Sequence, residues 1–256
     1  MWVSLVILMI GISFGYAAMP AVKAADSLAL LSLSKEYESR TGALVKAVLT
    51  IQNPSGMAAG MVEISFDPAV AVAVEAVAGD LLEDFLFVSN LQEPGKVALA
   101  WVDTEKVDKA GILAEITFRL RKVEDLKLQI TKASLQDADG GEISFDTRDG
   151  AIQKFSGVEL NPMDNLPADK EFTIYFNDVL HEMYIDSRFI YVKDAAGKPV
   201  DVSVARGRDP ESVVVKAPAG GYAPGKSYYL YISDNIESLS GKRMKKPVRM
   251  RFTIAR

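Results

Sequence analysis

Cysteine and histidine, two side chains that often carry catalysis, are almost absent from this chain of 256 residues. It has no cysteine, which excludes thiolate nucleophiles and cysteine-ligated zinc or iron–sulfur sites. The only histidine, His181, lies in the segment Asp178 to Glu182 between two predicted strands, and no Gly-x-Ser-x-Gly elbow lies in the predicted domains to supply a serine nucleophile. We therefore interpret His181 as a loop residue and predict that the protein is not an enzyme.

Carboxylate pairs are the next candidates for chemistry. Glu83-Asp84 and Asp103 with Glu105 lie where solvated loops are expected, and nothing makes two of them face each other as glycoside hydrolysis requires. The segment Asp137-Ala-Asp139-Gly140 resembles the start of a calcium loop but lacks the third ligand and the bidentate glutamate. We interpret it as a hairpin turn and expect no cofactor, while structural calcium elsewhere stays open.

A basic segment near the C-terminal end could bind an anion. Residues 242–251 carry six positive charges in ten positions. Such a patch suits an anionic polymer, but Val248, Met250, Phe252 and Ile254 alternate with Arg249 and its polar neighbours, as in a last strand with one wet face. Two interpretations stay open, a solvated strand or a contact with an anionic cell-wall polymer.

The N-terminal segment predicts export. From Trp2 to Val22 the chain is almost wholly apolar, and Val22-Lys23-Ala24 places small residues where signal peptidase reads them. We expect residues 1–24 to be a signal peptide cleaved after Ala24, with a retained membrane anchor as the alternative. Either places the rest of the chain outside the cytoplasm, extracellular or at the cell surface, which argues against a nucleic-acid partner.

Period-two alternation dominates the remainder and predicts an all-β chain of two domains. Short strands are separated by turn signals such as Asn53-Pro54, Pro94-Gly95 and Asp139-Gly140, which is typical of antiparallel sandwiches. A helical turn is expected only at Gly79 to Asp84. We place the first domain at 26–155 and the second at 158–256.

The second domain resembles a bacterial immunoglobulin-like module. Its strands alternate in the segment Phe172 to Asn177, and the strings DAAGKPV, GYAPGKSYYLYI and PVRMRFTI are similar to the module found in S-layer and surface proteins. The resemblance implies a seven-stranded Ig-like β-sandwich that spaces or displays its neighbour.

The first domain resembles cohesin modules, in order and spacing, over residues 27 to 153. The segments that carry the resemblance are GMVEISFDP at 60–68, AGILAEITF at 110–118, Asp139-Gly140, and DGAI at 149–152. The resemblance implies a nine-stranded jelly-roll β-sandwich that binds a dockerin module of another secreted protein, often a polysaccharide-degrading enzyme. The superfamily also contains carbohydrate-binding modules.

The resemblance also implies where a partner would bind. In cohesins the dockerin contacts one sheet face, and the best-studied group has an Asn and an Asp at the positions of Ala59 and Met61, so those polar contacts are missing here. The candidate partner-binding residues are Ala59, Met61, Glu63, Phe87, Trp101 and Asp103. Met61, Phe87 and Trp101 could form an apolar hot spot, with core packing as the alternative for some of them.

Two functions follow. The first is a non-catalytic, exported scaffolding protein whose cohesin-like module docks a dockerin-type partner. The second is a cell-surface structural or carbohydrate-binding protein without dockerin binding, for which Trp101 with Tyr37 or Phe87 are the available aromatic residues of the first domain.

Overall fold

The computed structural model describes residues 28–38 and 40–256, together with the backbone of a two-residue strand, β1 (Ile7–Leu8), that pairs in parallel with β14 (Phe172–Tyr175). The rest of the predicted signal peptide lies outside the described residues. The chain divides between Phe155 and Ser156 into two compact units. Strands dominate both units, and helix is limited in the described residues to two 3₁₀ turns, η1 (Asp80–Leu82) and η2 (Glu182–Tyr184).

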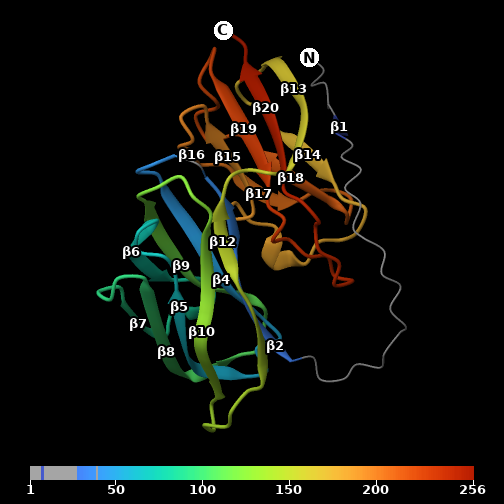
Figure 1. Cartoon of the computed structure of the whole chain (residues 1–256). Coiled ribbons are helices and arrows are strands. Elements are labelled where there is room, and N and C mark those ends of the chain that lie inside the picture. Colours follow the sequence, from blue (N-terminus) through green and yellow to red (C-terminus); the bar gives the residue numbers. More distant parts are fainter. Residues whose placement is uncertain (1–6, 9–27, 39) are drawn as a thin grey trace. The chain divides into compact units, whose positions relative to one another are not determined.

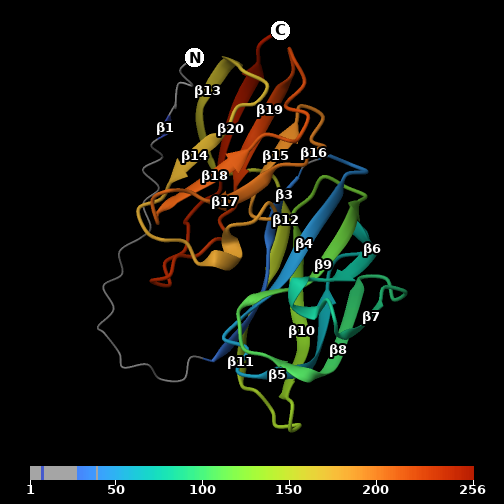
Figure 2. The ribbon, with the colours of Figure 1, turned by 180° about the vertical axis from the view of Figure 1, so that it is seen from behind.

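The first unit is a sandwich of two sheets, which form the two layers in Figures 1 and 2. One sheet has the order β3-β12-β10-β5-β8-β7, and the other β11-β2-β4-β9-β6. Their strands are β2 (Ala29–Leu33), β3 (Lys35–Tyr37), β4 (Leu44–Gln52), β5 (Met57–Ser65), β6 (Ala71–Ala78), β7 (Leu86–Asn90), β8 (Lys96–Val107), β9 (Gly111–Leu120), β10 (Leu126–Asp137), β11 (Phe145–Arg148) and β12 (Gly150–Gln153).

Two of these strands cross from one sheet to the other. β2 and β3 are separated only by Ser34, and β11 and β12 only by Asp149. Ser34 donates its backbone N–H to Val48 of one sheet, and its carbonyl accepts from Ala151 of the other. Counting each broken strand once gives nine strands, so the predicted nine-stranded jelly-roll sandwich is confirmed.

The core of the first unit fills the space between its sheets. Leu31, Leu49 and Ile116 of one sheet and Ile64 and Leu99 of the other are at most 2% exposed. In β2 and in the first half of β8 buried residues alternate with half-buried ones, because successive side chains of a strand point to opposite faces. In β4, by contrast, residues 47–51 are all buried. The predicted helical turn is present as η1, which buries Leu82 against this core.

The second unit is also built from two sheets, with the orders β1-β14-β18-β17 and β13-β20-β19-β15-β16. The strands not yet given are β13 (Val158–Leu166), β15 (Ile190–Asp194), β16 (Pro199–Val200), β17 (Ser203–Arg206), β18 (Ser212–Lys216), β19 (Ser227–Ile232) and β20 (Val248–Ile254). β20 alternates between buried and half-buried residues along its whole length, as its sequence predicts. An aromatic cluster of Phe172, Tyr222, Tyr228 and Phe252 packs in its core.

The two sheets of the second unit contain nine described strands, β1 and β13 to β20, against the seven predicted, and β13 is one of those that the sequence did not reveal. β13 pairs in parallel with β20, and only Leu166 of its nine residues is buried. β13 lies at the edge of its sheet and has only one buried side chain. Its sequence therefore lacks the period-two alternation of apolar and polar residues that would have revealed a strand. The identity of this unit as an Ig-like module stays a prediction.

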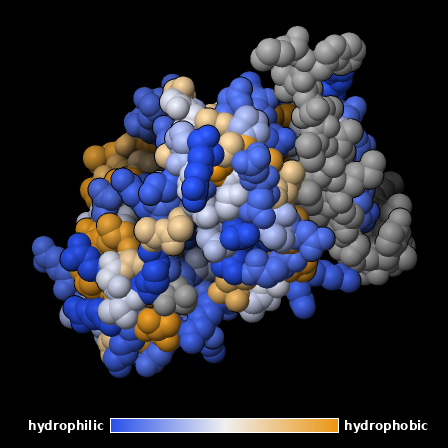
Figure 3. Space-filling view, turned by 90° about the horizontal axis from the view of Figure 1, so that it is seen from above, coloured by the Kyte–Doolittle hydropathy of each residue, from blue (hydrophilic) through white to orange (hydrophobic). Residues whose placement is uncertain are grey.

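Hydrophilic and hydrophobic residues alternate in small patches on the face of the molecule drawn in Figure 3, as on most protein surfaces. None of the helical segments in residues 28–38 and 40–256 has the length and apolar character that a membrane span requires.

Candidate functional site

The face of the β7-β8-β5-β10 layer that points away from the core carries three rows of side chains, each crossing four strands. The backbone register aligns Leu86, Val102, Ala59 and Gln136 in one row; Val88, Ala100, Met61 and Ser134 in the next; and Asn90, Ala98, Glu63 and Lys132 in the third. We call these twelve residues the outer sheet face. Residues from four strands come together on it because the pairings bring alternate positions of every strand to the same side.

The outer sheet face is apolar where β7 and β8 meet β5. Leu86 is 67% exposed, Val88 55% and Val102 48%, while Met61 is half-buried beside them. Large aliphatic side chains in adjacent positions on a sheet indicate an interaction surface more strongly than scattered ones do. Exposed polar residues of β10, such as Gln136 and Ser134, border the apolar part.

Trp101 and Phe87 do not belong to this face. They are cross-strand partners on the opposite side of the sheet, and Trp101 is 2% exposed within the core cluster. Phe87 is half-buried and packs against the same cluster. The prediction that these rings form an exposed hot spot with Met61 is therefore wrong for Trp101 and Phe87. Both side chains point to the inner side of the sheet, as Leu99 does.

Gly60 explains how the Trp101 indole fits against the sheet. The two residues are cross-strand partners, and a Cβ atom on Gly60 would lie 2.5 Å from Cζ2 of Trp101. Only a glycine leaves room for the ring to lie over β5 at this position. The indole Nε1 is buried and has no hydrogen-bond partner, so packing rather than polar contact holds the ring in place.

Charged residues lie at one end of the outer sheet face. Lys96 Nζ is 3.2 Å from a carboxylate oxygen of Glu63 and 3.5 Å from one of Glu93. The hydrogen bond to Glu63, and then the attraction of both carboxylates, raise the pKa of Lys96. Glu63 thus lies on the outer sheet face, as predicted, but its carboxylate is already in an ion pair with Lys96.

Asp103 follows Val102 and has a local role. Its Oδ1 accepts hydrogen bonds from the backbone N–H groups of Thr104 and Glu105. The bond from Glu105 contributes most to lowering the pKa of Asp103. Asp103 therefore stabilises the local backbone of β8 and is not brought into the three rows.

The residues considered for catalysis and metal binding also have structural roles. His181 precedes η2, and its Nδ1 accepts the Met183 amide at 3.4 Å. Asp137 Oδ1 accepts the amides of Asp139 and Gly141 within the predicted hairpin turn. Within residues 28–38 and 40–256, no cluster of three or more His, Cys, Asp or Glu side chains is suited to a metal ion.

The basic segment of the second unit is largely paired. Lys242 contacts Asp178 at 3.3 Å, Arg243 contacts Glu237 at 3.8 Å, and Arg251 contacts Asp164 at 3.4 Å. Arg249 forms a close ion pair with Glu159 and lies over the rings of Tyr229 and Tyr231. These acidic partners reduce the net positive charge available to an anionic polymer, which favours the interpretation as a solvated strand face.

Leu86, Val88 and Val102 are the members of the site that sequence reasoning missed. The stretch Leu86 to Val88 is apolar at every position, so alternation alone does not say whether Phe87 or its neighbours point outward. Because Phe87 pairs with the core residue Trp101, Phe87 points inward and its neighbours Leu86 and Val88 point outward. The regular alternation of Val97, Leu99 and Trp101 with smaller residues was the only signal for β8.

Comparison with known proteins gives one family assignment. Residues 31–153 match the model of the cohesin domain. A search of curated proteins gave no match.

Solved cohesins have similar structures at low sequence identity. A non-cellulosomal cohesin from the hyperthermophilic archaeon Archaeoglobus fulgidus is 18% identical, with a TM-score of 0.47 and coverage of 51% of this chain and 93% of that one. The sixth cohesin of scaffoldin B from Acetivibrio cellulolyticus, in complex with a mutant Cel5 dockerin, is 15% identical, with a TM-score of 0.46 and coverage of 50% and 99%. The seventh ScaB type I cohesin from Pseudobacteroides cellulosolvens is 19% identical, with a TM-score of 0.44 and coverage of 50% and 92%.

Proposed function

Because residues 31–153 form a cohesin domain, we propose that this chain is a non-catalytic binding protein that docks a dockerin-type module on the outer sheet face. The apolar group of Leu86, Val88 and Val102, exposed on the surface of an otherwise packed sheet, is the observation that carries the proposal. A hydrophobic centre with a polar border is the usual anatomy of a protein–protein interface.

The composition of the outer sheet face specifies the kind of partner. Two hydrogen bonds to charged groups would each contribute about 1.5 to 3 kcal/mol, and Ala59 and Met61 cannot make them through their side chains. Covering the exposed parts of three aliphatic side chains contributes roughly 1 kcal/mol per residue. The free energy gained by burying these side chains can therefore replace most of what the two missing hydrogen bonds would contribute, provided that the partner presents aliphatic or aromatic side chains of its own.

Direct carbohydrate binding by the first unit has less support. Sugar platforms need exposed aromatic rings, and the outer sheet face carries none among its twelve residues. Of the rings that the sequence offered, Tyr37 is 5% exposed and Trp101 2%. A link to polysaccharide degradation would then come through the docked partner and not through this face.

Export and display complete the proposal. The apolar segment from Trp2 to Val22 and the small residues before Ala25 support delivery to the extracellular side. The second unit then acts as the spacer that presents the cohesin domain at the cell surface.

Calorimetric titration of the full chain with dockerin modules encoded in the same genome tests the docking proposal. Val88→Lys places a charge in the apolar part of the outer sheet face, so the affinity should fall at least tenfold, about 1.4 kcal/mol. Val77→Lys is the matched control, because Val77 is an exposed valine of β6 in the other sheet. Absence of micromolar binding to any dockerin, or equal losses in both variants, would contradict the proposal.

A further inference from the structure

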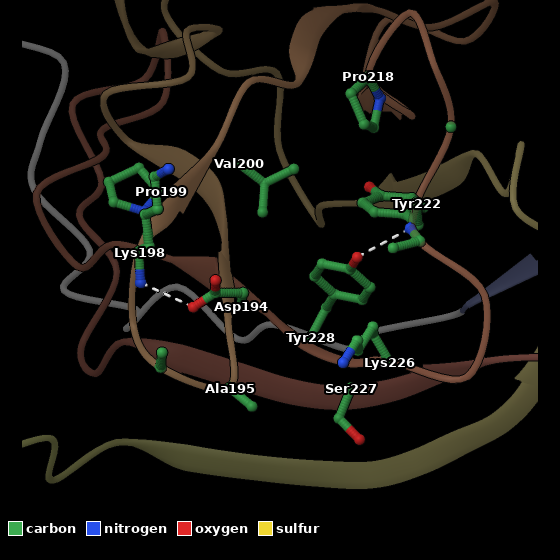
Figure 4. Close-up of a pocket in the computed structure, with 13 residues that line it drawn as sticks. Asp194, Ala195, Lys198, Pro199, Val200, Pro218, Tyr222, Lys226, Ser227 and Tyr228 are labelled. Atoms are coloured by element: carbon green, nitrogen blue, oxygen red, sulfur yellow. Dashed lines mark hydrogen bonds between the residues drawn. The ribbon is translucent and has the colours of Figure 1, made fainter.

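The second unit contains a cavity of about 520 Å³ that the proposed function does not use. It lies between the turn that joins β15 to β16 and the loop before β19, as Figure 4 shows. Its volume falls within the range of roughly 300 to 1,000 Å³ that small-molecule sites occupy. Its lining residues are Asp194, Ala195, Ala196, Lys198, Pro199, Val200, Pro218, Gly221, Tyr222, Ala223, Lys226, Ser227 and Tyr228.

A buried hydroxyl group marks the inner wall of this cavity. Tyr222 is 2% exposed, and its hydroxyl oxygen is buried without a hydrogen-bond partner. In Figure 4 this hydroxyl lies on the side of the ring that faces Val200. Buried polar atoms are nearly always hydrogen-bonded, so an unpaired hydroxyl in a cavity wall indicates a site for an acceptor. Burial raises the pKa of Tyr222, which keeps the group a neutral donor.

Tyr228 provides a second hydroxyl in the same wall. Its oxygen accepts the Ala223 amide at 2.9 Å, which leaves its proton for donation. The two rings pack against each other with centroids 5.0 Å apart. Tyr222 is held in position by its own amide, which donates to Ala168 at 2.8 Å.

The remaining lining residues define an apolar body and a positive rim. Alanine, proline and valine side chains and the tyrosine rings form the walls. Lys198 and Lys226 are exposed at the rim, against the single carboxylate of Asp194, whose Oδ1 already accepts the Lys198 amide at 2.8 Å. The rim therefore has an excess of one positive charge.

We infer that this cavity binds a small organic carboxylate with an apolar body. The hydrocarbon part contacts the proline, valine and tyrosine walls, the hydroxyls donate to its oxygen atoms, and the rim lysines attract its charge. The inference concerns the second unit alone, so its failure would leave the docking proposal for the first unit unaffected.

Titration of the full chain with benzoate, followed by amide chemical shifts in two-dimensional NMR spectra, tests the inference. We expect saturable shifts at Ala223 and Lys226, and several-fold weaker binding of benzamide, which has the same shape but no charge. Tyr222→Phe removes only the hydroxyl and should weaken benzoate binding roughly threefold to tenfold.

The matched control is Tyr175→Phe, which removes a hydroxyl that donates to Asp209 outside the cavity and should leave the affinity unchanged. Lys226→Gln tests the charge separately and should weaken benzoate more than benzamide. The inference is overturned if benzoate gives no saturable shifts, if the shifts map elsewhere, if benzamide binds equally well, or if Tyr222→Phe binds benzoate like the wild type.

Discussion

At the scale of single residues, the pair Gly60 and Trp101 links the core of the first unit to its outer surface. The indole lies over the glycine on the inner side of the sheet, while the neighbours of both residues in sequence, Met61 and Val102, lie on the outer side. Displacing the ring would therefore disturb the β5–β8 pairing that aligns the rows of the outer sheet face. Trp101→Ala is a poor probe of binding for the same reason, since truncating a buried Trp costs about 3 to 5 kcal/mol of stability.

Gly60→Ala should destabilise the first unit, although alanine is otherwise more favourable than glycine within a strand. Its Cβ would lie 2.5 Å from Trp101 Cζ2 and 3.0 Å from Leu135 Cδ2, so the core must shift at a cost of about 1 to 3 kcal/mol. Urea unfolding measures the loss. The same substitution in a Trp101→Phe background should cost less, because the smaller ring leaves room; equal costs in both backgrounds would refute the steric explanation.

At the scale of elements, the jelly roll depends on strands that leave one sheet and continue in the other. Ser34 performs this change between β2 and β3. Its backbone contacts both sheets, and its buried Oγ accepts the Val48 amide at 2.9 Å and donates to Glu36 at 2.7 Å. The side chain thus supplies a hydrogen bond at the point where regular ladder pairing is interrupted.

Ser34→Ala should reduce the free energy of unfolding by about 1 to 3 kcal/mol, because the Val48 amide loses a buried acceptor. Ser65→Ala is the control, since Ser65 is half-buried at the end of β5 and lies away from any crossing point. Chemical denaturation followed by tryptophan fluorescence measures both. If the two variants lose equal stability, the hydroxyl of Ser34 has no special role at the crossing.

At the scale of the whole molecule, charge is divided unevenly between the two units. Residues 26–157 contain 13 Lys and Arg against 21 Asp and Glu, whereas residues 158–256 contain 15 against 13. An acidic first unit favours the approach of a basic partner, while the apolar part of the outer sheet face supplies most of the affinity.

If the chain is exported, cleavage by signal peptidase should leave a defined new N-terminus. Mass spectrometry of the protein from a bacterial host should find a chain that begins at Ala25, because signal peptidase requires small residues before the cut. Ala24→Leu should block this cleavage, and Ala17→Leu, within the apolar segment, should not. An intact N-terminus in the membrane fraction would support the anchor, and an intact chain in the cytoplasm would contradict export.

The sequence by itself determined the all-β class, the nine strands of the first unit and the cohesin resemblance. These features depend on local patterns, namely period-two alternation and turn residues, that each strand carries in its own residues. The resemblance, and not the patterns alone, implied that Ala59, Met61 and Glu63 lie on the strand that would contact a dockerin. The sequence did not reveal β13, whose pairing with β20 buries too few of its residues to leave a pattern.

Only the tertiary structure decided which apolar residues face solvent. Phe87, Val88, Trp101 and Val102 have similar hydrophobicity, and their sides of the sheet depend on how β7 and β8 align with β5. In the observed register Trp101 and Phe87 point into the core. The proposed contact residues are therefore Leu86, Val88 and Val102 in their place. The cavity beside Tyr222 likewise depends on a loop and a turn separated in sequence, so no local pattern could indicate it.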